Sequence, residues 1–144
     1  MKAARHRRGN ALVEFALGFF MLFTCVAGIF QYGYSMYVYN ALEAAVTEGA
    51  VFAARATYDT RNNTFETTVK NMAVFGNEAG TGSVLVPGLS AGNIALLRSP
   101  ASGVPKTVTV RVSSVTVHAV FRNFTFTGKP SAAVRFSGEY FTSE

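Results

Sequence analysis

Glu14 is the residue whose type and position could do the most chemistry in this sequence. It is the only charged side chain between Ala11 and Phe30. A carboxylate is expensive to hold in lipid, and ionisable groups within membrane segments are usually paired and functional. Two simpler roles are also open to it, namely reaching the nearby headgroups or favouring a helix N-terminus through the helix dipole. The chemistry expected of Glu14 is therefore charge pairing and not catalysis.

Catalytic groups are sparse elsewhere in the chain. The sequence has two histidines, His6 and His118, and His118 alternates out of phase with its apolar neighbours, so it is expected to face away from the core. Ser113 and Ser114 have no acidic partner in the local sequence, and no cluster has the spacing of metal ligands. We therefore expect no enzyme activity, no cofactor and no metal site.

The basic charge of the chain comes mainly from its beginning. The formal net charge is +5, and residues 1–9 contain four cations, without which nine basic residues stand against eight acidic ones. The remaining cations are scattered along the sequence, so the electrostatic footprint of a phosphate binder is absent. The glycine-rich stretch 76–82 lacks the Lys-Ser/Thr continuation of a phosphate-binding loop and predicts turns. We expect no nucleic-acid partner.

Residues 11–30 are long enough to cross a membrane once. At a rise of about 1.5 Å per residue, a helix over this segment spans the roughly 30 Å hydrocarbon layer. The leader cations lie on one side, whereas an uncharged stretch up to Glu43 follows on the other, which predicts cytoplasmic residues 1–9 and an exported C-terminal part. A cleaved secretory signal fits poorly because its apolar region is shorter, about 7–15 residues. Lipoprotein processing at Cys25 would split the span.

The helix is expected to continue past the membrane, over residues 10–57. Small and apolar residues recur there on one face at three- and four-residue spacing: Leu42, Ala45, Val46, Gly49, Phe52, Ala53 and Ala56. Such a face permits close backbone approach, either to the chain's own domain or to another helix. Four tyrosines near the helix exit, Tyr32, Tyr34, Tyr37 and Tyr39, would lie in the headgroup layer or pack against neighbouring helices. Residues 58–144 suffice for one exported domain.

The exported part combines a short helix with strands. Asn63 and Glu66 could cap the helix and Gly76 could end it, with an apolar face made of Phe65, Val69 and Met72. Residues 58–63 and 76–103 are expected to be connections and loops. Period-2 alternation then indicates half-buried strands with Val108, Val110, Val112, Val115, Val117, Ala119 and Phe121 facing inward, and further strands at 124–126 and 133–141. An antiparallel sheet against the outer half of the long helix gives an α+β fold, in which the single cysteine forms no intramolecular disulfide.

The order of basic leader, Gly9, Asn10, Glu14 and apolar helix resembles the class III signal of type IV pilin-like proteins. More specifically, residues 8–17, 41–53 and 69–77 resemble segments of TadE-like proteins, which are pseudopilins or minor pilins of tight adherence (type IVc) pili. The resemblance implies a pilin-like fold and cleavage by a prepilin peptidase after Gly9 on the cytoplasmic side. The mature chain would then begin at Asn10.

The resemblance also implies a role in pilus assembly, adhesion or secretion. The partners would be other pilins and pilus assembly platform proteins, with oligomers formed through the N-terminal helix. The protein would be held in the bacterial inner membrane and could enter an extracellular pilus or lie at its tip. Cleavage would free the ammonium of Asn10, and pairing with Glu14 would make Glu14 an assembly residue. The alternative is a permanent single-pass membrane anchor whose exported domain binds a ligand, and only the pilin interpretation requires cleavage after Gly9.

Overall fold

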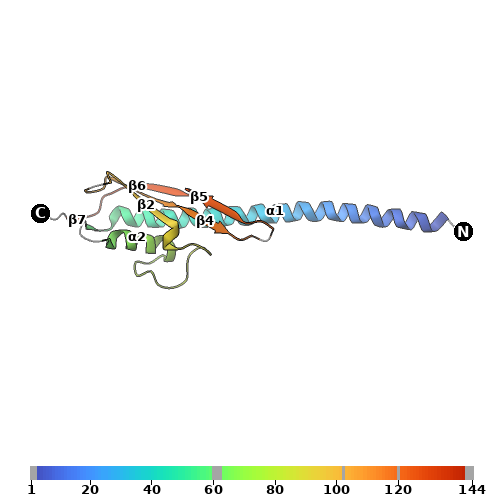
Figure 1. The fold of residues 1–144 in the computed structure, drawn as a ribbon, viewed down its shortest axis with the longest axis horizontal. Helices are drawn as coiled ribbons and strands as arrows, with labels where there is room; N and C mark the ends of the chain where they lie inside the picture. Colours follow the sequence, from blue (N-terminus) through green and yellow to red (C-terminus); the bar gives the residue numbers. More distant parts are fainter. Residues whose placement is uncertain (1–2, 60–62, 102, 120, 142–144) are drawn as a thin grey trace. The chain divides into compact units, whose positions relative to one another are not determined.

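The computed structural model of the chain describes residues 3–59, 63–101, 103–119 and 121–141, with side chains from Gly9 onward. Its elements in chain order are α1 (Ala3–Arg55), β1 (Tyr58–Asp59), α2 (Thr64–Phe75), the 3₁₀ helix η1 (Ala91–Asn93), β2 (Ile94–Ser99), β3 (Thr107–Val112), β4 (Ser114–Val117), β5 (Phe124–Thr127), β6 (Ser131–Arg135) and β7 (Tyr140–Phe141). The long N-terminal helix and the antiparallel strands confirm the predicted α+β class (Figure 1). The chain forms two compact units, one up to Tyr34 and one from Ser35.

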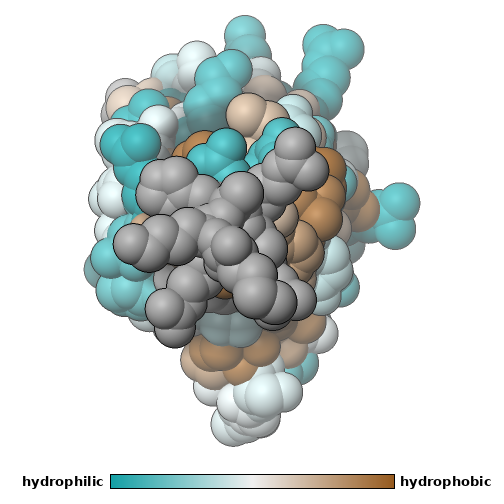
Figure 2. All heavy atoms as spheres, turned by 90° about the vertical axis from the view of Figure 1, so that its right-hand side faces the viewer, coloured by the Kyte–Doolittle hydropathy of each residue, from teal (hydrophilic) through white to brown (hydrophobic). Residues whose placement is uncertain are grey.

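The first unit presents apolar side chains to its surroundings. Between Gly9 and Phe30 every residue is exposed except Ala27, which is half-exposed. The exposed fractions of Leu12, Phe15 and Ile29 are 69%, 72% and 74%. The face of the molecule drawn in Figure 2 combines hydrophobic surface, in brown, with hydrophilic surface, in teal. Because folded domains in water bury most of their large apolar side chains, this segment is built for an apolar environment.

The second unit is organised around the C-terminal part of α1. The buried residues of this part are Val38, Leu42, Ala45, Val46, Gly49, Ala50 and Ala53. The predicted face is therefore confirmed at five of its seven positions. Phe52 is half-buried because it lies at the edge of the buried arc, and Ala56 is half-buried and follows the end of the helix at Arg55.

The helix α2 packs closely against α1 at Gly49. A Cβ built on Gly49 would lie 2.8 Å from the Cβ of Ala73 in α2, and 3.4 Å from the backbone oxygen of Val69. Figure 1 shows α2 running alongside this part of α1. The small face of α1 is thus used for close approach to the chain's own domain, which was one of the two uses expected for it.

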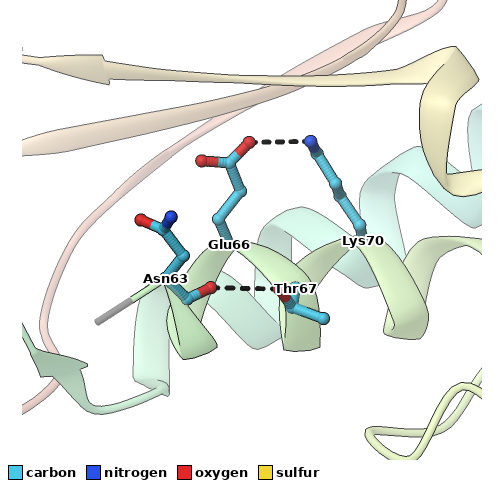
Figure 3. Close-up of polar contacts among 4 residues, drawn as sticks. All are labelled: Asn63, Glu66, Thr67 and Lys70. Carbon is cyan, nitrogen blue, oxygen red and sulfur yellow. Dashed lines mark hydrogen bonds and ion pairs between the residues drawn. The ribbon is translucent and has the colours of Figure 1, made fainter.

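The N-terminal end of α2 differs from the prediction, whereas its C-terminal end agrees with it. The expected cap by Asn63 and Glu66 is wrong, because the Asn63 side chain makes no capping hydrogen bond and its backbone is not extended, with φ −90° and ψ 16°. Its carbonyl oxygen instead accepts hydrogen bonds from the backbone N–H and the hydroxyl of Thr67, while Glu66 pairs with Lys70 at 2.7 Å (Figure 3). The end at Gly76 is confirmed, with φ 71° and its N–H donating to the carbonyl of Met72.

The apolar face predicted for α2 is largely buried. Phe65 and Val69 are buried, together with Ala73 and Val74, and Met72 is half-buried. This face closes the side of the second unit that lies next to α1.

The strands form one three-stranded sheet and two short pairs. In the sheet, β3 lies between β2 and β6 and is antiparallel to both, so that Val110 is opposite Leu96 on one side and Ala132 on the other. The strands β4 and β5 form a second antiparallel pair. The alternation predicted for β3 and β4 is confirmed, since all five of its valines are buried: Val108, Val110, Val112, Val115 and Val117.

Several strand boundaries differ from the prediction. β2 lies in the region that we expected to be loops. Its sequence does not alternate, so no local pattern predicts it, and it becomes a strand by pairing with β3. The alternation expected to reach Ala119 and Phe121 stops at Val117, and 56% of Phe121 is exposed. The stretch 133–141 is not one strand, since β6 ends at Arg135 and β7 begins at Tyr140.

A short parallel pair, β1 with β7, joins the end of α1 to the last strand. It corrects the expectation of a polar connection at Tyr58, whose side chain is buried and packs edge-on against Phe65 and Phe136 at centroid distances of 5.2 and 6.2 Å. Arg98 of β2 donates a hydrogen bond to the Tyr58 hydroxyl at 2.5 Å, and its guanidinium lies 5.6 Å from the ring centroid. Tyr58 is therefore a core residue with a satisfied polar tip.

Candidate processing and assembly site

The bond predicted to be cleaved joins Gly9 to Asn10, close to the start of α1. Both residues are exposed. A Cβ built on Gly9 meets no atom within 4 Å. An enzyme can therefore approach this position from outside the chain, and a side chain can be introduced at position 9 without a packing penalty.

Glu14 lies one helical turn after Asn10 on the same side of α1. Residues four apart in a helix have Cβ atoms about 5–6 Å from one another, so their side chains can interact. Both residues are exposed. In the uncleaved chain the backbone nitrogen of Asn10 belongs to a neutral peptide bond, and only cleavage would convert it into an ammonium. The structure thus brings the three predicted residues, Gly9, Asn10 and Glu14, into one short segment of helix.

The residues after Glu14 form a continuous apolar surface. Within the described residues, α1 is long and apolar enough to cross a membrane once, by length and composition. Phe15, Phe19 and Phe23 stack along one side at one-turn intervals, with ring centroids 6.3 and 6.4 Å apart. The hydroxyl of Thr24 donates to the carbonyl of Phe20 at 2.8 Å, which satisfies this polar group inside the segment. Apart from the carboxylate of Glu14, the segment contains no polar side chain that would lack a hydrogen-bond partner in lipid.

The tyrosines after the span divide between the two expected uses. Tyr32 and Tyr37 are exposed, at 68% and 70%, as residues of a headgroup layer would be. Tyr39 belongs to the second unit and packs against Phe126 of β5, with ring centroids 5.7 Å apart. Tyr32 and Tyr37 therefore have different surroundings from Tyr39.

The residues considered for catalysis do not come together. His118 is exposed, and its Nδ1 lies 3.2 Å from the side-chain oxygen of Asn123. Ser114 is exposed at the start of β4, opposite Thr127 of β5. Among the described residues, no three His, Cys, Asp or Glu side chains are grouped so as to hold a metal ion.

The sequence reasoning missed an open groove in the second unit. It has a volume of about 760 Å³ and lies between the end of α1, β1, α2 and β7. Val51, Phe52, Met72 and Phe141 contribute apolar lining. These residues come from distant parts of the sequence, so no local pattern marks the groove. It appears only when the two helices are packed together.

The comparisons with known proteins concern the N-terminal helix. Residues 9–51 match the family model described as TadE-like protein. The match includes Gly9, Asn10, Glu14 and the small-residue face as far as Gly49, whereas the predicted similarity of residues 69–77 lies outside it. Neither the curated proteins nor the solved structures give a match. The resemblance inferred from the sequence is thus confirmed for the helix, because residues 9–51 of this chain are similar to TadE-like proteins.

Proposed function

We propose that this protein is a pilin-like subunit associated with a Tad pilus, processed by a prepilin peptidase after Gly9. One observation carries the proposal: an exposed apolar stretch of membrane length, residues 11–30 of α1, follows Gly9 closely, holds a single carboxylate, and lies within the TadE-like match. Its role is structural, because the described residues assemble no catalytic group and the TadE-like segment supplies an anchor and an assembly helix.

In this proposal residues 11–30 hold the protein in the bacterial inner membrane until assembly. The basic residues of 1–9 keep the N-terminus in the cytoplasm, and the second unit is exported. Its partners are the prepilin peptidase, other pilins and the pilus assembly platform. The exposed apolar surface around Phe15, Phe19 and Phe23 would then exchange lipid for neighbouring helices when subunits associate.

Glu14 would set the register in which the helices of neighbouring subunits associate. Cleavage creates an ammonium at Asn10, one turn away on the same chain and equally available to a neighbouring chain. In an apolar medium an unpaired carboxylate is costly, whereas a carboxylate paired with an ammonium is much less so. Subunits whose charges meet are favoured over subunits that are out of register.

Processing is the step that tests the proposal. The intact mass of membrane-extracted protein, from a host with active prepilin peptidase, should correspond to a chain that starts at Asn10. Gly9→Leu should retain residues 1–9. Gly18→Leu is the matched control, because a Cβ at Gly18 also meets no atom within 4 Å, and this variant should be cleaved normally.

A wild-type chain that keeps Met1 to Gly9 under these conditions would contradict the pilin proposal. It would favour the permanent membrane anchor, for which the groove of the second unit would be the first place to look for a ligand. Cleavage of Gly9→Leu at the same bond would show that the processing enzyme does not read the glycine.

A further inference from the structure

The charges of the second unit are divided between its helices and its strands. Residues 79–138 contain no carboxylate and six cations: Arg98, Lys106, Arg111, Arg122, Lys129 and Arg135. Residues 43–78, which include the end of α1 and all of α2, contain five carboxylates and three cations. Six of the cations that looked scattered in the sequence therefore belong to a stretch that contains the strands β2 to β6 and no carboxylate, whereas the helical stretch has an excess of acidic residues.

The outward face of the three-stranded sheet carries two of these cations. Arg111 of β3 lies between Ala95 of β2 and Ser131 of β6, and Arg135 of β6 lies beside Thr107. Both arginines are exposed and alternate with inward residues of their strands. Arg135 is four positions along β6 from Ser131, the partner of Arg111, so the two arginines stand roughly 14 Å apart at opposite ends of the β3–β6 pair.

The rest of this sheet face contains one exposed large apolar residue. Leu97 of β2 is 46% exposed and lies in the row between the two arginines, next to Thr109, which is opposite Ala133. The small neighbours leave Leu97 and the two guanidinium groups as the features that a partner would meet.

The groove between α1 and α2 has the complementary character. Among the described residues, its lining includes the carboxylates of Glu48, Asp59 and Glu78 and one cation, Arg55. Its apolar lining is accessible too, since Val51 and Phe141 are 43% and 52% exposed. The groove therefore combines a net negative charge with apolar surface, while the sheet face combines a net positive charge with Leu97.

We propose that the sheet face of one copy of this protein docks into the groove of a second copy. Leu97 would meet the apolar lining, and Arg111 and Arg135 would face the carboxylates of Glu48 and Glu78. Opposite charges across an interface select the correct partner and register. The sheet face and the α1–α2 groove belong to opposite sides of the second unit, as the positions of β6 and α2 in Figure 1 show, so one copy cannot satisfy both surfaces by itself.

This contact joins two different surfaces, and such heterologous contacts continue from copy to copy unless the rotation closes a ring. It deepens the proposed function by naming a contact between exported domains, and it rests on that function only in so far as copies meet during assembly. It does not depend on cleavage after Gly9, so the two proposals fail independently.

The test uses full-length protein in detergent, with Cys25 changed to Ser so that introduced thiols are the only ones. Thr109→Cys marks the sheet face and Thr68→Cys marks the groove, of which Thr68 is a lining residue. A short bismaleimide should give covalent dimers when the two variants are mixed, and none when either is treated alone. Dimers from Thr109→Cys alone would show a symmetric sheet-to-sheet contact and overturn the proposal, as would the absence of dimers from the mixture.

Charge reversal then tests the pairing itself. Arg111→Glu with Arg135→Glu on the sheet-marked copy should abolish the mixed dimer, and so should Glu48→Lys with Glu78→Lys on the groove-marked copy. Combining the two reversed copies should restore it. Arg122→Glu is the control, because Arg122 is exposed and lies in the connection between β4 and β5, outside the three-stranded sheet, and it should leave the dimer yield unchanged. A mixed dimer that still forms when either copy alone carries its reversed charges would overturn the assignment of these residues.

Discussion

The closest packing between the two helices gives the sharpest prediction about the fold. Changing Gly49 to Ala places a methyl group 2.8 Å from the Cβ of Ala73. Carbon atoms normally approach to about 3.5–4.0 Å, so the helices must separate locally by roughly 0.7–1.2 Å. Overpacking of this kind costs about 1–3 kcal/mol. Alanine in a helix interior recovers about 0.8–1.0 kcal/mol relative to glycine. We expect a net destabilisation of about 1 kcal/mol.

A double-mutant cycle separates these two contributions. Ala73→Gly removes the methyl group that the new side chain meets. The double variant Gly49→Ala with Ala73→Gly should therefore lose less free energy of unfolding than the two single variants lose together. The propensity terms of the two positions cancel in the cycle, and the remaining coupling should be about 1–3 kcal/mol.

The assay is urea unfolding of the full chain in detergent. The sequence has no tryptophan, and the buried Tyr58 makes near-ultraviolet circular dichroism of tyrosine a suitable probe of tertiary structure. Additive free energies, within about 0.5 kcal/mol, would refute the close contact between α1 and α2. A stabilised Gly49→Ala variant would refute it as well, because propensity would then act without a clash.

Three further predictions concern assembly, topology and metal independence. Glu14→Gln keeps the shape of the side chain and removes its charge, so piliation should fall while cleavage and membrane levels stay normal; wild-type piliation would leave Glu14 as a positional residue only. A reporter fused after Glu144 should be active only outside the cytoplasm, and cytoplasmic activity would contradict both the pilin and the anchor interpretations. Chelator should leave the melting temperature of the protein unchanged, since a drop would reveal a structural metal among residues where no ligand cluster is described.

The features predicted well from the sequence depend on neighbouring residues along the chain. The apolar helix is recognisable because its length and hydropathy are local properties. The end of α2 is recognisable because Gly76 takes a left-handed conformation that other residues avoid. The alternation of Val108, Val110 and Val112 marks β3 because one face of a strand is buried.

The features that were missed depend on partners far away in the sequence. β2 has no alternating pattern and forms because β3 supplies its hydrogen-bonding partner. The two residues of β1 form a strand only because β7 returns to them from the other end of the chain. Asn63 is a residue type that favours the N-cap position, yet its backbone conformation is not extended and its side chain makes no capping hydrogen bond.

The sequence by itself determined the membrane-length helix, the candidate cleavage bond at Gly9–Asn10 and the position of Glu14 one turn later, because helix periodicity and hydropathy are properties of consecutive residues. It also indicated five of the buried residues of α1 and all three buried valines of β3. Only the tertiary structure decided that Gly49 meets Ala73, and that Arg111 and Arg135 share a sheet face with Leu97 between their rows. The groove beside Glu48 and Glu78 is likewise defined only by the tertiary structure. These are arrangements between distant segments, which follow from packing and strand register and not from local pattern.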